Sequence, residues 1–153
     1  GILTADCAPI FIFDKKKSFI CCLHAGWKGT LLNIAKKSIH LITKKYNKNI
    51  NDIIVIIGPC LGKKNFEVDS NFKNDFTKLN ENYKNFFQKK NSHKDIFDMR
   101  GIINYQFKNL HIKNIFNLAE DTYQNKQLFF SYRRSSSANT SETRRMINII
   151  CFQ

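Results

Sequence analysis

The sequence lacks any apolar run that approaches the ~20 residues of a membrane-spanning helix. It also lacks the pattern of a disulfide framework, because five cysteines is an odd number and the adjacent Cys21 and Cys22 would point to opposite faces of a strand. It contains no internal repeat, low-complexity tail or domain linker. We therefore expect a single domain over residues 1–153, with no membrane partner, in the reducing cytoplasm.

Acidic residues are few: Asp and Glu total 12 against 25 Lys and Arg, which gives a net charge of +13. A basic domain with interleaved aromatic residues can bind nucleic acid through phosphate contacts and base stacking. The lysines, however, are scattered in short groups at 15–17, 36–37, 44–45, 63–64 and 89–90. This distribution favours a solvated surface over a specific nucleic-acid face, and the positive field is expected to attract small anions such as phosphate.

Hydrophobic periodicity predicts an α/β fold, with a mixed sheet covered by helices. Two apolar runs, 9–13 and 18–23, are expected to pair as an antiparallel hairpin that turns at residues 14–17. A β-branched run at 52–57 predicts a central strand buried on both faces. We also expect strands at 66–68, 112–118 and 146–152, helices at 27–46, 69–79 (capped by Asp69) and 99–110, and a polar loop at 131–141; segment 81–94 has the least ordered pattern.

Cys7 and His24 lie next to the two runs of the expected hairpin, so both should fall at the same end of the sheet. A thiolate and an imidazole are ligands for zinc or copper, and a third ligand would leave one position open for chemistry. The alternative is a buried thiol and a hydrogen-bonded histidine. Asp6, beside Cys7, is a candidate to orient a ligand or hold a reacting proton, or else a carboxylate that bonds nearby turn amides.

The loop from His24 to Thr30 joins a strand end to a helix start. Its glycines, Gly26 among them, let the backbone come close to a ligand, and the exposed N–H groups with the helix dipole favour an anion. Lys28 would strengthen that preference, although a lysine here can equally be solvated. Trp27 could stack on a flat base or act as a hydrophobic staple beneath the helix.

Two later segments also carry candidate binding residues. Cys60 follows the central strand, where ligand loops of open α/β sheets lie, or else it is an inert thiol in a turn. Arg133 and Arg134 place two guanidinium groups beside an aromatic run. Because arginine forks suit phosphate, one of the two is expected to meet substrate or phosphate, and the other to pair with an acidic side chain such as Asp98 or Glu67.

These loops carry a family resemblance. Four motifs occur in a typical order, and the match covers nearly the whole chain: Thr4-Ala5-Asp6-Cys7; His24-Ala25-Gly26-Trp27-Lys28-Gly29-Thr30; Ile57-Gly58-Pro59-Cys60-Leu61-Gly62 with Phe66-Glu67-Val68; and Phe129-Phe130-Ser131-Tyr132-Arg133-Arg134. The sequence resembles the YfiH-like family, variously called multicopper polyphenol oxidase (laccase), purine nucleoside phosphorylase or peptidoglycan editing factor. The resemblance implies an α-β-β-α layered fold and a second histidine ligand from a preceding segment. We therefore expect this chain to be the C-terminal part of a longer protein.

The resemblance implies a zinc-dependent purine nucleoside phosphorylase that acts on adenosine, inosine or methylthioadenosine with phosphate, with adenosine deamination as a further activity. Three alternatives remain. Copper-dependent oxidation of phenols would need many histidines, and this chain has four. A hydrolase that edits peptidoglycan precursors would use Cys7 as nucleophile and His24 as base. A basic nucleic-acid-binding module would use none of these loops.

Overall fold

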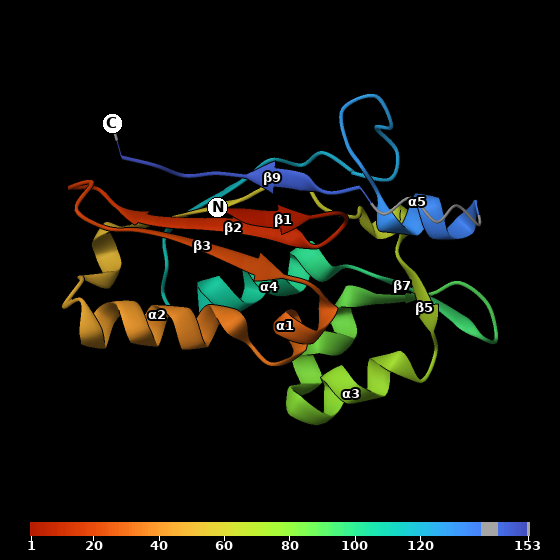
Figure 1. The fold of residues 1–153 in the computed structure, drawn as a ribbon. Helices are drawn as coiled ribbons and strands as arrows, with labels where there is room; N and C mark the ends of the chain where they lie inside the picture. The colour runs from red at the N-terminus through yellow and green to blue at the C-terminus, as the bar shows by residue number, and fades with distance from the viewer. Residues whose placement is uncertain (139–143, 153) are drawn as a thin grey trace.

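The computed structural model describes residues 1–138 and 144–152, which form a layered α/β fold. Figure 1 shows a two-stranded ribbon, β1 (Ile2–Thr4) with β9 (Met146–Asn148), lying over one face of a larger sheet, and helices covering the other face. The ribbon joins the two ends of the described chain, because β1 and β9 pair antiparallel. The expected mixed sheet covered by helices is confirmed.

The larger sheet has four strands in the order β3-β2-β4-β8. Strands β2 (Ala8–Asp14) and β3 (Ile20–Ala25) form the expected antiparallel hairpin, with Pro9 opposite His24. Strand β4 (Ile53–Ile57) pairs antiparallel with β2 and parallel with β8 (Asn114–Asn117), so it is central as predicted. Its burial alternates, because Ile54 and Ile56 are only half-buried, so the expected burial on both faces holds only in part.

The helix expected over 27–46 is divided in two by a left-handed residue. Helix α1 (Trp27–Leu31) ends at Leu32, and α2 (Ile34–Lys45) begins after Asn33, whose φ is 52°. The Asn33 side chain accepts the backbone N–H of Lys36 and so caps α2. The apolar face of α2 packs into the core against the sheet, and the fully or almost fully buried members of this face are Ala35, Ile39 and Ile42.

A small second sheet, in the order β5-β7-β6, lies beside helix α3 at one end of the molecule. It consists of β5 (Glu67–Asp69), β6 (Phe87–Lys89) and β7 (Lys94–Phe97), and a short 3-10 helix (Glu81–Phe86) precedes β6. Helix α3 (Phe72–Leu79) follows Asn71, so the expectation that Asp69 caps it is wrong: Asp69 ends a strand. Segment 81–94 is ordered because Tyr83 is buried and Phe87 stacks on Phe97.

The remaining elements return the chain to the ribbon. Helix α4 (Met99–Asn109) begins at Asp98, whose carboxylate accepts the N–H of Gly101. The polar loop expected at 131–141 is instead helix α5 (Tyr132–Ser137), capped by Ser131; residues 139–143 lie outside the described part of the chain. The final strand is shorter than expected, because β9 ends at Asn148. Two further 3-10 turns are Ile50–Asp52 and Lys63–Asn65.

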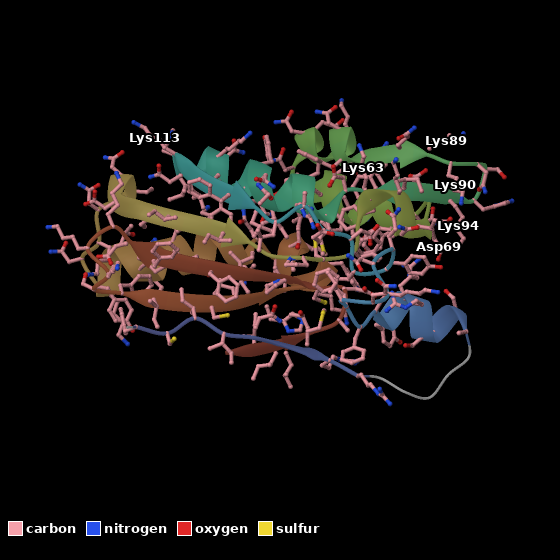
Figure 2. The ribbon with its side chains drawn as sticks, turned by 90° about the horizontal axis from the view of Figure 1, so that it is seen from above. Lys63, Asp69, Lys89, Lys90, Lys94 and Lys113 are labelled. Carbon is pink, nitrogen blue, oxygen red and sulfur yellow. The ribbon has the colours of Figure 1, made fainter. Side chains whose placement is uncertain are left out.

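The surface lysines are spread over the molecule. Figure 2 shows Lys113 near one end of the molecule, and Lys89 and Lys90 near the other. Lys90 pairs with Glu67, and Lys94 lies 2.7 Å from an Asp69 carboxylate oxygen, so part of this charge is paired on the surface. Within the described residues, none of the helices is both long and apolar enough to cross a membrane.

Candidate functional site

One pocket of about 390 Å³ gathers many of the predicted site residues. It lies at the end of the β2–β3 hairpin, between the hairpin, α1 and α5. The register explains this placement, since Ala8 pairs with Ala25 and so brings the loops before β2 and after β3 together. The lining residues are Ala5, Asp6, Cys7, His24, Trp27, Leu61, Phe66, Met99, Tyr132, Arg133 and Arg145.

Cys7 and His24 line this pocket from the two sides of the expected hairpin, Cys7 just before β2 and His24 within β3. Cys7 is in the turn between β1 and β2, and His24 is the penultimate residue of β3. Burial raises the pKa of the Cys7 thiol above its usual range, the Asp6 carboxylate raises it further, and the Arg145 guanidinium opposes them. The sulfur is therefore a protonated thiol at neutral pH in the metal-free protein, and a bound metal would have to displace that proton.

Gly26 lies against the Cys7 sulfur. A Cβ placed on Gly26 would come within 2.7 Å of Cys7 Sγ, closer than real Cβ atoms approach a neighbour. The backbone at Gly26 has φ −83° and ψ −178°, which any residue can adopt, so glycine is needed here for space and not for conformation. Gly26 was expected to let the backbone approach a ligand; in the structure, the group that the backbone approaches is the candidate metal-binding thiol of Cys7.

Trp27 forms one wall of the pocket and is also held by the fold. Its ring meets Phe72 edge-on at 5.2 Å between centroids, and its side chain remains 37% exposed. Both alternatives for Trp27 are therefore compatible with its position: it packs on α3 and keeps a face accessible. Lys28 is not in the pocket wall; its ammonium lies over the Trp27 ring at 5.3 Å. Helix α1 has five residues, so its dipole supports an anion less than expected.

Asp6 joins three segments that are far apart in sequence. Its carboxylate accepts hydrogen bonds from the Thr122 hydroxyl (2.6 Å), the Ser131 hydroxyl (3.0 Å) and the backbone N–H of Arg133 (2.6 Å). Its φ of 82° lies in the left-handed region, a conformation held by these bonds. Asp6 therefore bonds local groups, as in the alternative of a carboxylate that stabilises the surrounding turns. Its bond to the Arg133 N–H also fixes the position of the Arg133 backbone.

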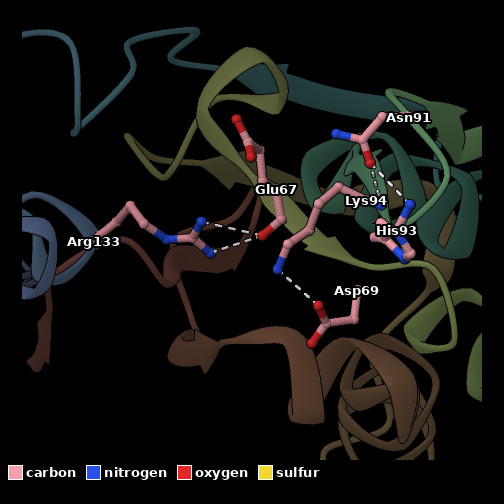
Figure 3. Close-up of polar contacts among 6 residues, drawn as sticks. All are labelled: Glu67, Asp69, Asn91, His93, Lys94 and Arg133. Carbon is pink, nitrogen blue, oxygen red and sulfur yellow. Dashed lines mark hydrogen bonds and ion pairs between the residues drawn. The ribbon is translucent and has the colours of Figure 1, made fainter.

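The two neighbouring arginines have different surroundings. Arg133 lines the pocket, and both its terminal nitrogens donate to the Glu67 backbone carbonyl at 3.1 Å (Figure 3). Arg134 points elsewhere: its guanidinium donates to the carbonyls of Thr122, Tyr123 and Phe129. The expectation that one arginine pairs with the carboxylate of Asp98 or Glu67 is therefore wrong, and Arg134 is committed to holding the 122–129 loop.

Cys60 does not reach the pocket. It is fully buried, and Arg100 donates to its sulfur at 3.2 Å. Burial raises the pKa of the Cys60 thiol, although the Arg100 charge partly opposes it. The interpretation of Cys60 as a substrate-binding residue is not supported by this position, which is that of an inert thiol in the turn after β4.

Several lining residues were not singled out from the sequence, above all Tyr132 and Arg145. Tyr132 stands within the last matched motif, next to Arg133, so its place in the motif could have identified it. Arg145 precedes β9, and only the pairing of β9 with β1 carries it to the site of Cys7. That pairing joins opposite ends of the chain, so no local sequence pattern predicts it.

Comparison with known proteins identifies the family. The family model described as multi-copper polyphenol oxidoreductase laccase matches residues 1–153. The chain belongs to this laccase-like family. A solved structure of the YfiH protein from Bacillus licheniformis superposes with a TM-score of 0.82 at 27% identity, covering 88% of this chain and 51% of that one. The expected YfiH-like fold and family membership are both confirmed.

Curated relatives of this chain carry an enzyme name. A protein named purine nucleoside phosphorylase from Rickettsia conorii is 35% identical over 138 residues, which is 88% of this chain and 55% of the relative. One of the same name from Staphylococcus aureus is 30% identical over 133 residues, covering 84% and 48%. The chain thus spans about half the length of these relatives.

The family description implies copper, and the donor types in the pocket can be tested against it. A thiolate and an imidazole both suit copper or zinc, and Cys7 and His24 supply one of each. Across residues 1–138 and 144–152, no group of three or more His, Cys, Asp or Glu side chains could hold a metal. His40, His93 and His111 are exposed and do not line the pocket. The described residues therefore fit part of a ligand set, with two donors.

Proposed function

We propose that this pocket belongs to a cytoplasmic, zinc-dependent purine nucleoside phosphorylase, in which the full-length protein cleaves nucleosides such as adenosine, inosine or methylthioadenosine with phosphate. The observation that carries the proposal is the combination of Cys7 and His24 with an accessible aromatic ring and a guanidinium group in one pocket. The names of the Rickettsia and Staphylococcus relatives support the same activity. Adenosine deamination is a second activity that we propose for the same site.

The apolar side of the pocket suits the base. Trp27, Phe66 and Tyr132 contribute aromatic rings, and Leu61 and Met99 contribute aliphatic surface. A purine is flat and apolar on its faces, so burial against such rings favours its binding, and the volume of about 390 Å³ is within the range of small-molecule sites.

The cationic side suits phosphate. The glycosidic C–N bond breaks with positive charge developing on the sugar, so an anion held nearby both stabilises and captures it. A phosphate oxygen forms the new bond to the sugar carbon, and the base leaves with the electrons of the C–N bond and takes up a proton. Arg133 would orient that phosphate, because its side chain is fixed by the Glu67 carbonyl and its backbone by Asp6.

Cys7 and His24 would hold the metal, together with at least one ligand from beyond the described residues. A zinc ion bound there would supply Lewis-acid chemistry, polarising a leaving group or a water molecule. Gly26 leaves room for the Cys7 sulfur, and His24 is placed by its register with Pro9. These residues position the donors before any metal binds.

The alternatives rank lower on specific observations. Copper-dependent oxidation of phenols is favoured by the family description, but only one of the four histidines lines the pocket. A hydrolase with Cys7 as nucleophile needs a thiolate, whereas burial and Asp6 raise the pKa of that thiol. A specific nucleic-acid surface is disfavoured because the lysines occur in short groups scattered along the chain, and Lys90 and Lys94 are paired with Glu67 and Asp69.

The test is nucleoside cleavage by the full-length protein, with and without phosphate. We expect cleavage only with phosphate, and we expect Cys7→Ala and His24→Ala to lose bound zinc and turnover together. His40→Ala is the matched control, because His40 is exposed on α2, away from the pocket. Full turnover in either pocket variant would show that these residues are only structural.

A further inference from the structure

The chain contains two pairs of consecutive arginines, at 133–134 and 144–145. One arginine of each pair lines the pocket. Arg133 comes from α5 and Arg145 from the residue before β9. Their neighbours face elsewhere: Arg134 binds backbone carbonyls, and Arg144 lies over the Phe130 ring at 5.9 Å, outside the pocket lining. Two arginines from consecutive elements, α5 and the segment before β9, therefore line one pocket.

Arg145 is oriented by an aromatic ring of the same pocket. Its guanidinium carbon lies 6.0 Å from the centre of the Tyr132 ring, within the range of a cation–π contact. Arg145 lines the same pocket as Cys7, so its positive charge and the candidate metal-binding thiol face one cavity. The charge of Arg145 thus acts on the site that holds Cys7.

Arg133 keeps donors available on the other side. A guanidinium has five N–H donors, and the Glu67 carbonyl takes one from each terminal nitrogen. The Arg133 guanidinium carbon lies 5.6 Å from the centre of the Phe66 ring, so this ring and the Glu67 carbonyl together orient the side chain. The remaining donors can serve a planar or tetrahedral oxyanion.

We infer that Arg145 is the second guanidinium of an oxyanion-binding site, which with Arg133 holds inorganic phosphate in the pocket. This inference rests on the proposed function for the identity of the anion as a co-substrate. An isolated phosphate next to a thiol and a carboxylate would be repelled by Asp6, and a second positive charge offsets that repulsion.

The experiment compares Arg145→Ala with the matched control Arg144→Ala in the full-length protein. Binding of inorganic phosphate is measured by isothermal titration calorimetry without nucleoside, and the KM values for phosphate and inosine are measured separately. Loss of a charge-assisted contact should weaken phosphate binding and raise its KM by about 10- to 100-fold. The KM for inosine and all Arg144→Ala values should remain near wild type.

Arg145→Lys serves as a second variant. It keeps the positive charge but loses the two parallel N–H donors of the guanidinium, so its phosphate affinity should be intermediate. It also provides the test if Arg145→Ala does not fold. Wild-type phosphate affinity in the Arg145 variants, or no phosphate binding by the wild type, would overturn the inference. Phosphate binding that depends on Arg145 without phosphorolysis would leave this site standing and reject the proposed function. Phosphorolysis with an unchanged KM for phosphate in Arg145→Ala would support the proposed function and reject Arg145 as a phosphate-binding residue.

Discussion

Gly26→Ala tests whether the position of the Cys7 sulfur matters for function. The added Cβ would lie 2.7 Å from Cys7 Sγ, whereas non-bonded heavy atoms rest at roughly 3.5–4.0 Å, so the sulfur or the loop must move by about 1 Å. The backbone angles of Gly26 suit alanine, so the effect comes from this contact alone. We expect a stability cost of about 1–3 kcal/mol. Turnover should fall on the order of 100-fold, because a ~1 Å misplacement at a reacting site has that effect.

The assay is kcat/KM for inosine with phosphate, together with zinc content per chain and the thermal midpoint, in the full-length protein. Gly29→Ala is the matched control in the same loop. A Cβ there would meet its nearest atom, the His24 carbonyl oxygen, at 3.6 Å, an ordinary contact, and alanine favours the helix. The control should keep wild-type zinc and turnover. If Gly26→Ala also keeps both, the Cys7 sulfur has no positional role and the reasoning fails.

Two further predictions concern stability. Arg134→Ala should lower the free energy of unfolding by about 2–4 kcal/mol in urea titrations, because it leaves carbonyls of the 122–129 loop without their donor; an unchanged midpoint would contradict the structural role. Burial of Asp14 opposes its ionisation, but hydrogen bonds from Ser18 and the Lys48 ammonium outweigh it and lower the Asp14 pKa. The difference in unfolding free energy between wild type and Asp14→Asn should therefore be largest above about pH 4, and it should shrink as the pH falls through the lowered pKa of Asp14. A difference that stays constant from pH 7 to pH 2 would refute this prediction.

The sequence predicts the centre of the fold well, because its signals there are local. The β2–β3 hairpin follows from two apolar runs joined by a polar turn, and its register alone carries Cys7 and His24 to one end of the sheet. Helix α4 follows from its hydrophobic periodicity, and the structure adds a cap from Asp98 that the sequence analysis did not predict. The family motifs add the segment containing Arg133, which lines the pocket from helix α5.

The errors arise where tertiary contacts outweigh local preference. Helix α5 was expected to be a loop because its sequence is polar, yet Ser131 caps it and Asp6 holds its first turn from the far end of the chain. A serine at the start of this segment could have predicted the helix cap, whereas no sequence pattern predicts the hydrogen bonds that Ser131 and Arg133 donate to Asp6. Arg145 likewise reaches the pocket only through the pairing of β9 with β1, which joins opposite ends of the chain. Arg134 binds carbonyls of the preceding 122–129 segment, and no sequence pattern shows which carbonyls a guanidinium will bind.

The most direct measurement is product analysis after the full-length protein is incubated with inosine, with and without inorganic phosphate. The account predicts equal amounts of hypoxanthine and ribose 1-phosphate with phosphate present, and no cleavage without it. Free ribose in place of ribose 1-phosphate, phenol oxidation under copper loading without nucleoside cleavage, or cleavage independent of phosphate would contradict it.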